Sequence, residues 1–123
     1  MSQPIDSNSY LAALITLYLE LPETPMRASL ADQALARRLY KEGISLQTVE
    51  SALLLGSLRR LIRHQDAPPL SPIRSLAYFL PVIDELTANP SPANYLDYLR
   101  LKLQQVAKAK SAAGHFSTLP DGR

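Results

Sequence analysis

Prolines and glycines divide this chain into apolar runs whose spacing is helical throughout. The ten prolines and four glycines among 123 residues stand mostly between these runs. Within each run, apolar residues recur three or four positions apart, as they do along one face of an α-helix. No stretch of strand length alternates apolar and polar residues. The sequence therefore predicts an all-α fold, a single compact bundle of about five helices with no sheet.

One domain accounts for the whole length. An apolar content of 46% is enough to form a core, whereas half of a 123-residue chain would bury too little surface to be stable. We expect a single helical domain over residues 1–114 and a flexible C-terminal tail over residues 115–123, where no periodicity is visible.

Polar residues mark the limits of the first two predicted helices. Ser7 or Ser9 is expected to cap a helix that continues to about residue 21. Ser29, followed three residues later by Asp32, predicts a capping box at the start of the second helix, and Gly43 is expected to end it in a left-handed conformation. The predicted buried stripe of the second helix consists of Leu30, Ala34, Leu35 and Leu39.

The third predicted helix is the central one. Ser45 is expected to cap it, and it continues to about residue 64 with apolar residues on two opposite sides. Ala52 and Gly56 lie one turn apart, which predicts that another part of the chain approaches closely there. We therefore expect this helix to be the most buried element of the bundle.

Two serine–proline pairs are expected to start the remaining helices. Ser71 precedes Pro72 at the start of a fourth helix, and Pro81 within that helix predicts a kink or two short helices. The pair at 91–92 precedes a fifth helix over about 93–112 that Gly114 ends. Its apolar seam, buried in the bundle or against a second copy, comprises Leu96, Leu99, Leu103 and Val106. The predicted core of the whole bundle includes Leu35, Leu39, Val49, Leu53, Leu58, Leu76, Leu80 and Leu99.

The residues needed for most catalytic and metal chemistry are missing. The chain has no cysteine, and its four glycines are too scattered for a phosphate-binding loop. Its two histidines, His64 and His115, do not form a metal or catalytic cluster by themselves. Asp84 and Glu85 are adjacent, so on a helix they point about 100° apart. We predict no catalytic residue, no metal site, no cofactor and no enzymatic activity.

Positive charge is concentrated in two segments. Four basic residues and one acidic residue give residues 59–74 a net charge of +3, and five against one give residues 100–123 a net charge of +4. Three arginines of the first segment fall within a sector of about 100° on a helix, and three further cations lie on the polar face of the preceding helix. The candidate nucleic-acid-binding residues are Arg37, Arg38, Lys41, Arg59, Arg60 and Arg63. Arginine contacts phosphates well, so this face predicts binding to a DNA backbone without sequence preference. The alternative is an ordinary solvated surface, because cations are common at the C-terminal ends of helices.

A family resemblance covers roughly residues 30–86. The segments GISLQTVESALLLGSLRR and PIRSLAYFLPVIDEL resemble the DnaD-like helical modules of bacterial replication-initiation and primosome accessory proteins, and small uncharacterised proteins found beside mobile elements. The matching positions are Gly43, the Ala52–Leu53 pair, and Ser75, Leu76 and Tyr78. The resemblance implies a bacterial helical module that contacts DNA or replication proteins without catalysis.

Two functions are therefore open. The first is a DNA-associated accessory protein that contacts phosphates through the basic face. The second is a helical adaptor, a monomer or a dimer, that binds a protein through its first or last helix. The apolar run Tyr10–Leu21 is too short to span a bilayer and no positive charge precedes it, so we expect a buried or partner-facing helix and a cytoplasmic protein without membrane contact.

Overall fold

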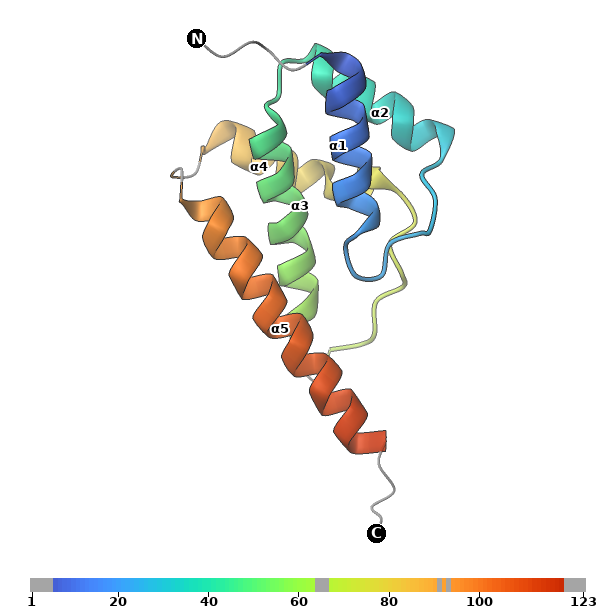
Figure 1. Ribbon diagram of the computed structural model, residues 1–123, viewed down its shortest axis with the longest axis vertical. Helices are drawn as coiled ribbons and strands as arrows, with labels where there is room; N and C mark the ends of the chain where they lie inside the picture. The colour runs from blue at the N-terminus through green and yellow to red at the C-terminus, as the bar shows by residue number, and fades with distance from the viewer. Residues whose placement is uncertain (1–5, 64–66, 91, 93, 119–123) are drawn as a thin grey trace.

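The computed structural model describes residues 6–63, 67–90, 92 and 94–118, with side chains described as far as residue 109. Its elements are α1 (Ser7–Leu19), α2 (Leu30–Lys41), α3 (Leu46–Leu61), the 3₁₀ helix η1 (Leu76–Phe79), α4 (Leu80–Ala88) and α5 (Tyr95–Thr118). No strand occurs among these described residues. The predicted all-α bundle is confirmed, and Figure 1 shows α3 passing between α1 on one side and α5 on the other.

Helix α3 is the centre of the bundle, as its two apolar sides predicted. It packs against α1, α4 and α5, and seven of its residues are buried. The Ser45 hydroxyl caps it by accepting a hydrogen bond of 3.1 Å from the backbone N–H of Thr48. Gly56 allows the predicted close approach, because a Cβ atom there would lie 2.7 Å from Cδ1 of the fully buried Phe79.

The N-terminal cap of α1 is Asp6, not Ser7 or Ser9 as expected. The Asp6 carboxylate accepts a hydrogen bond of 2.8 Å from the Ser9 backbone N–H, and this bond lowers the pKa of Asp6. Ser7 and Ser9 therefore lie inside the helix, and the prediction that one of them is the cap is wrong. The physical reason is that Asp6 already satisfies the free N–H groups of the first turn.

Helix α2 has the predicted capping box but a different buried face. Ser29 and Asp32 each accept a hydrogen bond from the other's backbone N–H, both of 3.0 Å. The second Asp32 carboxylate oxygen accepts a bond of 2.9 Å from the Leu76 backbone N–H, so Asp32 is buried. This contact turns Ala36 and Leu39 inward and leaves Leu30 82% exposed, which corrects the predicted stripe. The exposed Ala34 is a second correction. Gly43 ends the helix region with φ of 78°, the left-handed conformation expected.

The segment before α4 is less helical than predicted. Residues 67–75 form no helix, so the predicted start at Ser71–Pro72 is wrong. Instead Ile73 is buried and its N–H donates to the Glu23 carbonyl at 2.9 Å, which keeps this segment extended against the α1–α2 connection. The expected effect of Pro81 is confirmed, because η1 and α4 are two short helices with Pro81 in the first turn of α4.

Helix α5 is longer than expected at its C-terminal end. It continues through Gly114 to Thr118, so Gly114 does not end it and the predicted tail is helical over 115–118. A glycine inside a helix costs only about 1 kcal/mol, which is too little to end a helix by itself. The predicted start signal is the pair Ser91–Pro92. Three parts of the prediction lie outside the described residues: Ser91, Ala93 and residues 119–123.

The core agrees largely with the predicted one. Leu96 and Leu99 of the α5 seam are buried, and the helix packs on α3, so the seam is used within the bundle. Leu35 and Leu80 are only half-buried against the core. The predicted core residues that are buried are Leu39, Val49, Leu53, Leu58, Leu76 and Leu99.

Candidate functional site

The six candidate DNA-binding cations form two separate groups. Arg37, Arg38 and Lys41 lie in the second half of α2, beside the short connection to the start of α3. Arg59, Arg60 and Arg63 lie at the opposite end of α3, which is about 20 Å further along the helix at 1.5 Å per residue. Figure 1 shows these two regions at opposite ends of α3. The structure therefore does not bring the six cations together on one face.

Arg59 is held by a carboxylate of α4. Its two terminal nitrogens donate to the two carboxylate oxygens of Glu85 at 2.9 and 2.8 Å, a bidentate pair. This hydrogen bonding raises the pKa of Arg59 and lowers the pKa of Glu85. A phosphate would have to compete with Glu85 for the planar fork that makes arginine a good phosphate ligand.

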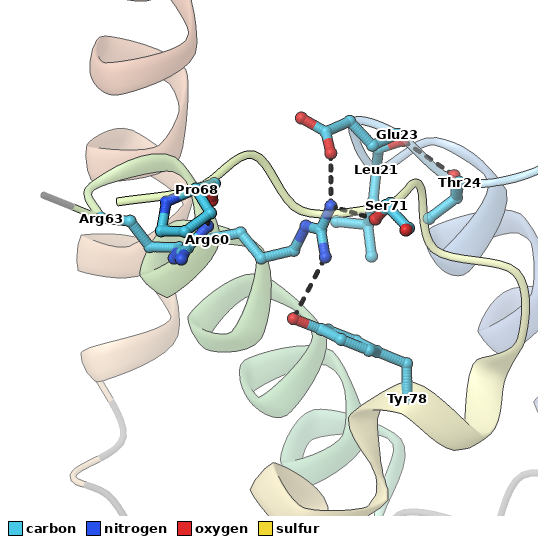
Figure 2. A network of polar contacts seen from close by, with 8 residues as sticks. All are labelled: Leu21, Glu23, Thr24, Arg60, Arg63, Pro68, Ser71 and Tyr78. Carbon is cyan, nitrogen blue, oxygen red and sulfur yellow. Dashed lines mark hydrogen bonds and ion pairs between the residues drawn. The ribbon is translucent and has the colours of Figure 1, made fainter. Parts of the chain in front are cut away.

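Arg60 is the most enclosed of the cations, with a side chain only 7% exposed. Figure 2 shows its guanidinium between three partners: the Glu23 carboxylate, the Ser71 carbonyl at 2.8 Å and the Tyr78 hydroxyl at 3.3 Å. The guanidinium carbon also lies 5.2 Å from the centre of the Tyr78 ring, within cation–π range. Arg60 therefore joins α3 to three other parts of the chain and acts as a structural residue.

Arg63 completes a basic hollow at this end of α3. It donates a hydrogen bond of 2.8 Å to the Pro68 carbonyl. The hollow has a volume of about 400 Å³. It is lined by Gly56, Arg59, Arg60, Arg63, Leu70, Tyr78 and Val82. His64 and Asp66 lie outside the described residues. Because Arg59 and Arg60 are each paired with a carboxylate, two of the three positive charges of the hollow are already compensated.

The three cations of α2 do not behave alike. Arg38 pairs with Glu42 one turn later, at 3.2 Å. Arg37 and Lys41 are exposed, and neither forms an ion pair within the described part of the chain. In the second basic segment, Arg100 pairs with Glu50 at 2.7 Å. Arg37 and Lys41 are thus exposed members of the predicted site whose positive charges no carboxylate of the described residues neutralises.

A second hollow, which sequence reasoning did not locate, lies between α1 and α2. Its volume is about 310 Å³, and it is lined by Leu11, Ala12, Ile15, Thr16 and Gln33. We call it the α1–α2 groove. The end of α2 meets the start of α1, where the Tyr40 and Tyr10 rings pack edge to face with their centres 5.1 Å apart. Near the start of α2, Leu30 is 82% exposed and Met26 is 95% exposed.

The sequence signal for this groove is the complete lack of charge in α1. None of the thirteen residues Ser7–Leu19 is acidic or basic, although only Tyr10, Leu14 and Tyr18 are buried. A surface helix of a bundle ordinarily carries charged residues on its outer face. The sequence already indicated that the first helix is buried or faces a partner, and the absence of charge from its outer face could also have located this groove.

No protein-family model, curated protein or solved structure matches this chain. The resemblance to DnaD-like modules therefore stays a prediction. Within the described part of the chain, no helix has both the length and the apolar character needed to cross a membrane. The surfaces of the bundle itself are the basis for inferring a function.

Proposed function

We propose that this chain is a non-catalytic interaction module that binds a protein partner through the α1–α2 groove. The observation that carries the proposal is the uncharged outer face of α1, which leads into a groove lined by Leu11 and Ile15. Of the two functions that the sequence left open, this is the adaptor, with its binding surface on the first helix and extending onto the second.

Exposed apolar side chains of the groove and of the start of α2 favour a bound partner energetically. Leu11 and Ile15 of the groove are partly exposed, and Leu30 and Met26, near the start of α2, are almost fully exposed. Burying apolar surface contributes about 25 cal/mol per Å², so covering several such side chains supplies a few kcal/mol. Contiguous apolar patches on a soluble domain characteristically mark binding sites.

DNA contact is the less favoured function, because its predicted residues are separated and occupied. Arg59 and Arg60 are paired with Glu85 and Glu23, and the α2 cations lie at the other end of α3. A phosphate backbone would be attracted only by the positive charge that these carboxylates do not already neutralise. Binding to DNA stays a prediction, and a separate titration tests it.

The protein-binding proposal is tested by site-specific crosslinking in cells that produce the chain naturally. A photo-crosslinking amino acid in place of Ala12 lies in the groove, and one in place of Gln104 lies on the exposed side of α5. We expect one discrete protein adduct from position 12 and none from position 104. The adduct should disappear when Leu30→Asp is added. Equal adducts from both positions, or an adduct indifferent to Leu30→Asp, would contradict the proposal.

The DNA alternative is tested by titrating mixed-sequence duplex across a salt series. Arg59→Gln and Arg63→Gln are combined and Arg60 is left intact, because Arg60 is enclosed and its loss would disturb the fold. Phosphate contacts by three to six cations would give a slope of log affinity against log salt of about −3 to −5, flattened by about two units in the double variant. We expect neither. Observing both would favour the DNA function over the adaptor.

A further inference from the structure

We propose that the partner segment in the α1–α2 groove is an amphipathic helix with acidic residues along one edge. This inference rests on the proposed function and specifies the chemistry of the partner. It follows from the apolar floor of the groove, from two exposed cations of α2 that form no ion pair with any described residue, and from the lack of acidic residues along α1.

The floor of the groove suits a helix. Leu11 and Ile15 are one turn apart on α1 and form a ridge, and Ala12 and Thr16 form a second, lower row beside it. Rows of this spacing are what the side chains of another helix pack into. The groove also lies between two packed helices, so a helical partner would continue the bundle by the same kind of packing that builds it.

The α2 side of the groove carries positive charge. At about 100° per residue, Leu30 and Arg37 fall on the same flank of α2 as Gln33, which lines the groove, and Lys41 lies one turn after Arg37 on the outward face of the helix. Arg38 falls on the opposite flank, where it pairs with Glu42. Arg37 and Lys41 are four residues apart, so acidic residues spaced by one helical turn in the partner can meet both.

Helix α1 brings no acidic group of its own to this edge. Ser7–Leu19 contains no charge, Asp6 is engaged at the cap of α1, and Asp32 is buried. A second copy that offered its own α1 would therefore leave Arg37 and Lys41 without carboxylate partners. A partner helix with a positive or neutral edge would leave them equally uncompensated, so charge complementarity favours an acidic one.

The experiment is a selection of helix-length peptides from a displayed random library on the wild-type chain. Ala12→Arg and Leu30→Asp serve as blocked variants, and both positions are exposed, so the bundle itself should remain folded, as circular dichroism can verify. We expect enriched peptides with apolar residues at i, i+3 or i+4, and i+7, and with Asp or Glu along one edge. Their binding should be lost in both blocked variants.

A matched pair of neighbouring arginines tests the charge assignment. Arg37→Glu should weaken binding of the selected peptides, and with Lys41→Glu added the loss should reach about tenfold. Arg38→Glu, a reversal of the same sign on the opposite flank of α2, should leave binding unchanged. Equal effects of Arg37→Glu and Arg38→Glu would overturn the assignment, because a long-range effect of net charge would then explain the loss.

The remaining outcomes separate this inference from the proposed function. If the peptides require the groove but are indifferent to Arg37→Glu, the acidic partner is overturned and the protein-binding module stands. Sedimentation that shows a dimer dissolved by Ala12→Arg would make the occupant a second copy. Binding to vesicles of anionic lipid that Ala12→Arg abolishes would make it a membrane surface. Either result overturns the acidic helix. If the groove binds none of these probes and crosslinking at Ala12 also fails, both proposals fall.

Discussion

Two tyrosines on the same face of α1 should respond in opposite directions to the loss of a hydroxyl group. Tyr10 and Tyr18 are both buried. The Tyr10 hydroxyl donates a hydrogen bond of 2.7 Å to the Ile44 carbonyl. The buried Tyr18 hydroxyl has no hydrogen-bond partner within the described part of the chain. Phenylalanine in place of each therefore removes a satisfied group in one case and an unsatisfied group in the other.

The magnitudes follow from the cost of leaving a buried polar group without a partner. A net hydrogen bond contributes about 0.5–1.5 kcal/mol, so Tyr10→Phe should lower the free energy of unfolding by about 1 kcal/mol. An unsatisfied buried hydroxyl costs about 1–3 kcal/mol, so Tyr18→Phe should raise it by about 1 kcal/mol after allowing for the small space left behind. The two variants should differ by about 2 kcal/mol.

Urea unfolding at neutral pH, followed by far-ultraviolet circular dichroism, measures this difference. The chain has no tryptophan, and circular dichroism does not depend on the tyrosines being changed. Equal m-values would show that the comparison is between similarly folded states. If Tyr18→Phe loses as much stability as Tyr10→Phe, the Tyr18 hydroxyl has a partner and the reasoning is refuted.

The same pair predicts a loss of stability at alkaline pH. Burial raises the pKa of Tyr10 to about 12, and burial together with the negative charge of Asp32 raises the pKa of Tyr18 to about 12, from an ordinary value of 10.0. As the pH rises, the unfolded chain therefore releases these two protons before the folded chain does. The free energy of unfolding keeps its full value below pH 10 and falls as the pH rises toward 12. Each phenylalanine variant should lose less stability over that interval than the wild type.

Three further outcomes test the packing and the ion pairs. Leu53→Ala should cost about 2–5 kcal/mol, because Leu53 is buried at the centre of α3, and a loss below 1 kcal/mol would contradict that position. Gly56→Ala should lower the free energy of unfolding in urea. Alanine gains about 1 kcal/mol of helix propensity, but overpacking against Phe79 costs about 1–3 kcal/mol. A net increase in stability would show that Phe79 moves freely. The hydrogen bonds from Arg59 lower the pKa of Glu85. The difference in stability between the wild type and Glu85→Gln should therefore persist above pH 4.5 and vanish as the pH falls through the lowered pKa. A difference that does not change with pH would contradict this.

Features that depend on neighbouring residues were predictable from the sequence. The Ser29–Asp32 capping box, the Ser45 cap and the left-handed Gly43 each involve groups within a few positions, so the local pattern carries the information. The two short helices around Pro81 follow from the missing N–H of proline in the same way. The fold class is built from such signals and was predictable for that reason.

Features that depend on distant residues were not predictable. The outward position of Leu30 follows from the contact between Asp32 and Leu76, which are 44 residues apart. Arg60 receives its partners from separate parts of the chain, so its sequence position on a basic helix end could not show that it is enclosed. The separation of the two groups of cations was, by contrast, predictable, because one group ends the helix before the short connection at 43–45 and the other lies about 20 Å along the next helix.

The double use of Asp32 has a consequence for the order in which the bundle assembles. One carboxylate caps α2 locally and also holds the start of η1, with the whole of α3 in the intervening loop. Closing a loop of that length costs about 3 kcal/mol of chain entropy. The capping box needs no such closure, so α2 can form early with one Asp32 oxygen still in water. The other oxygen finds its partner only when η1 docks, and that late event encloses α3.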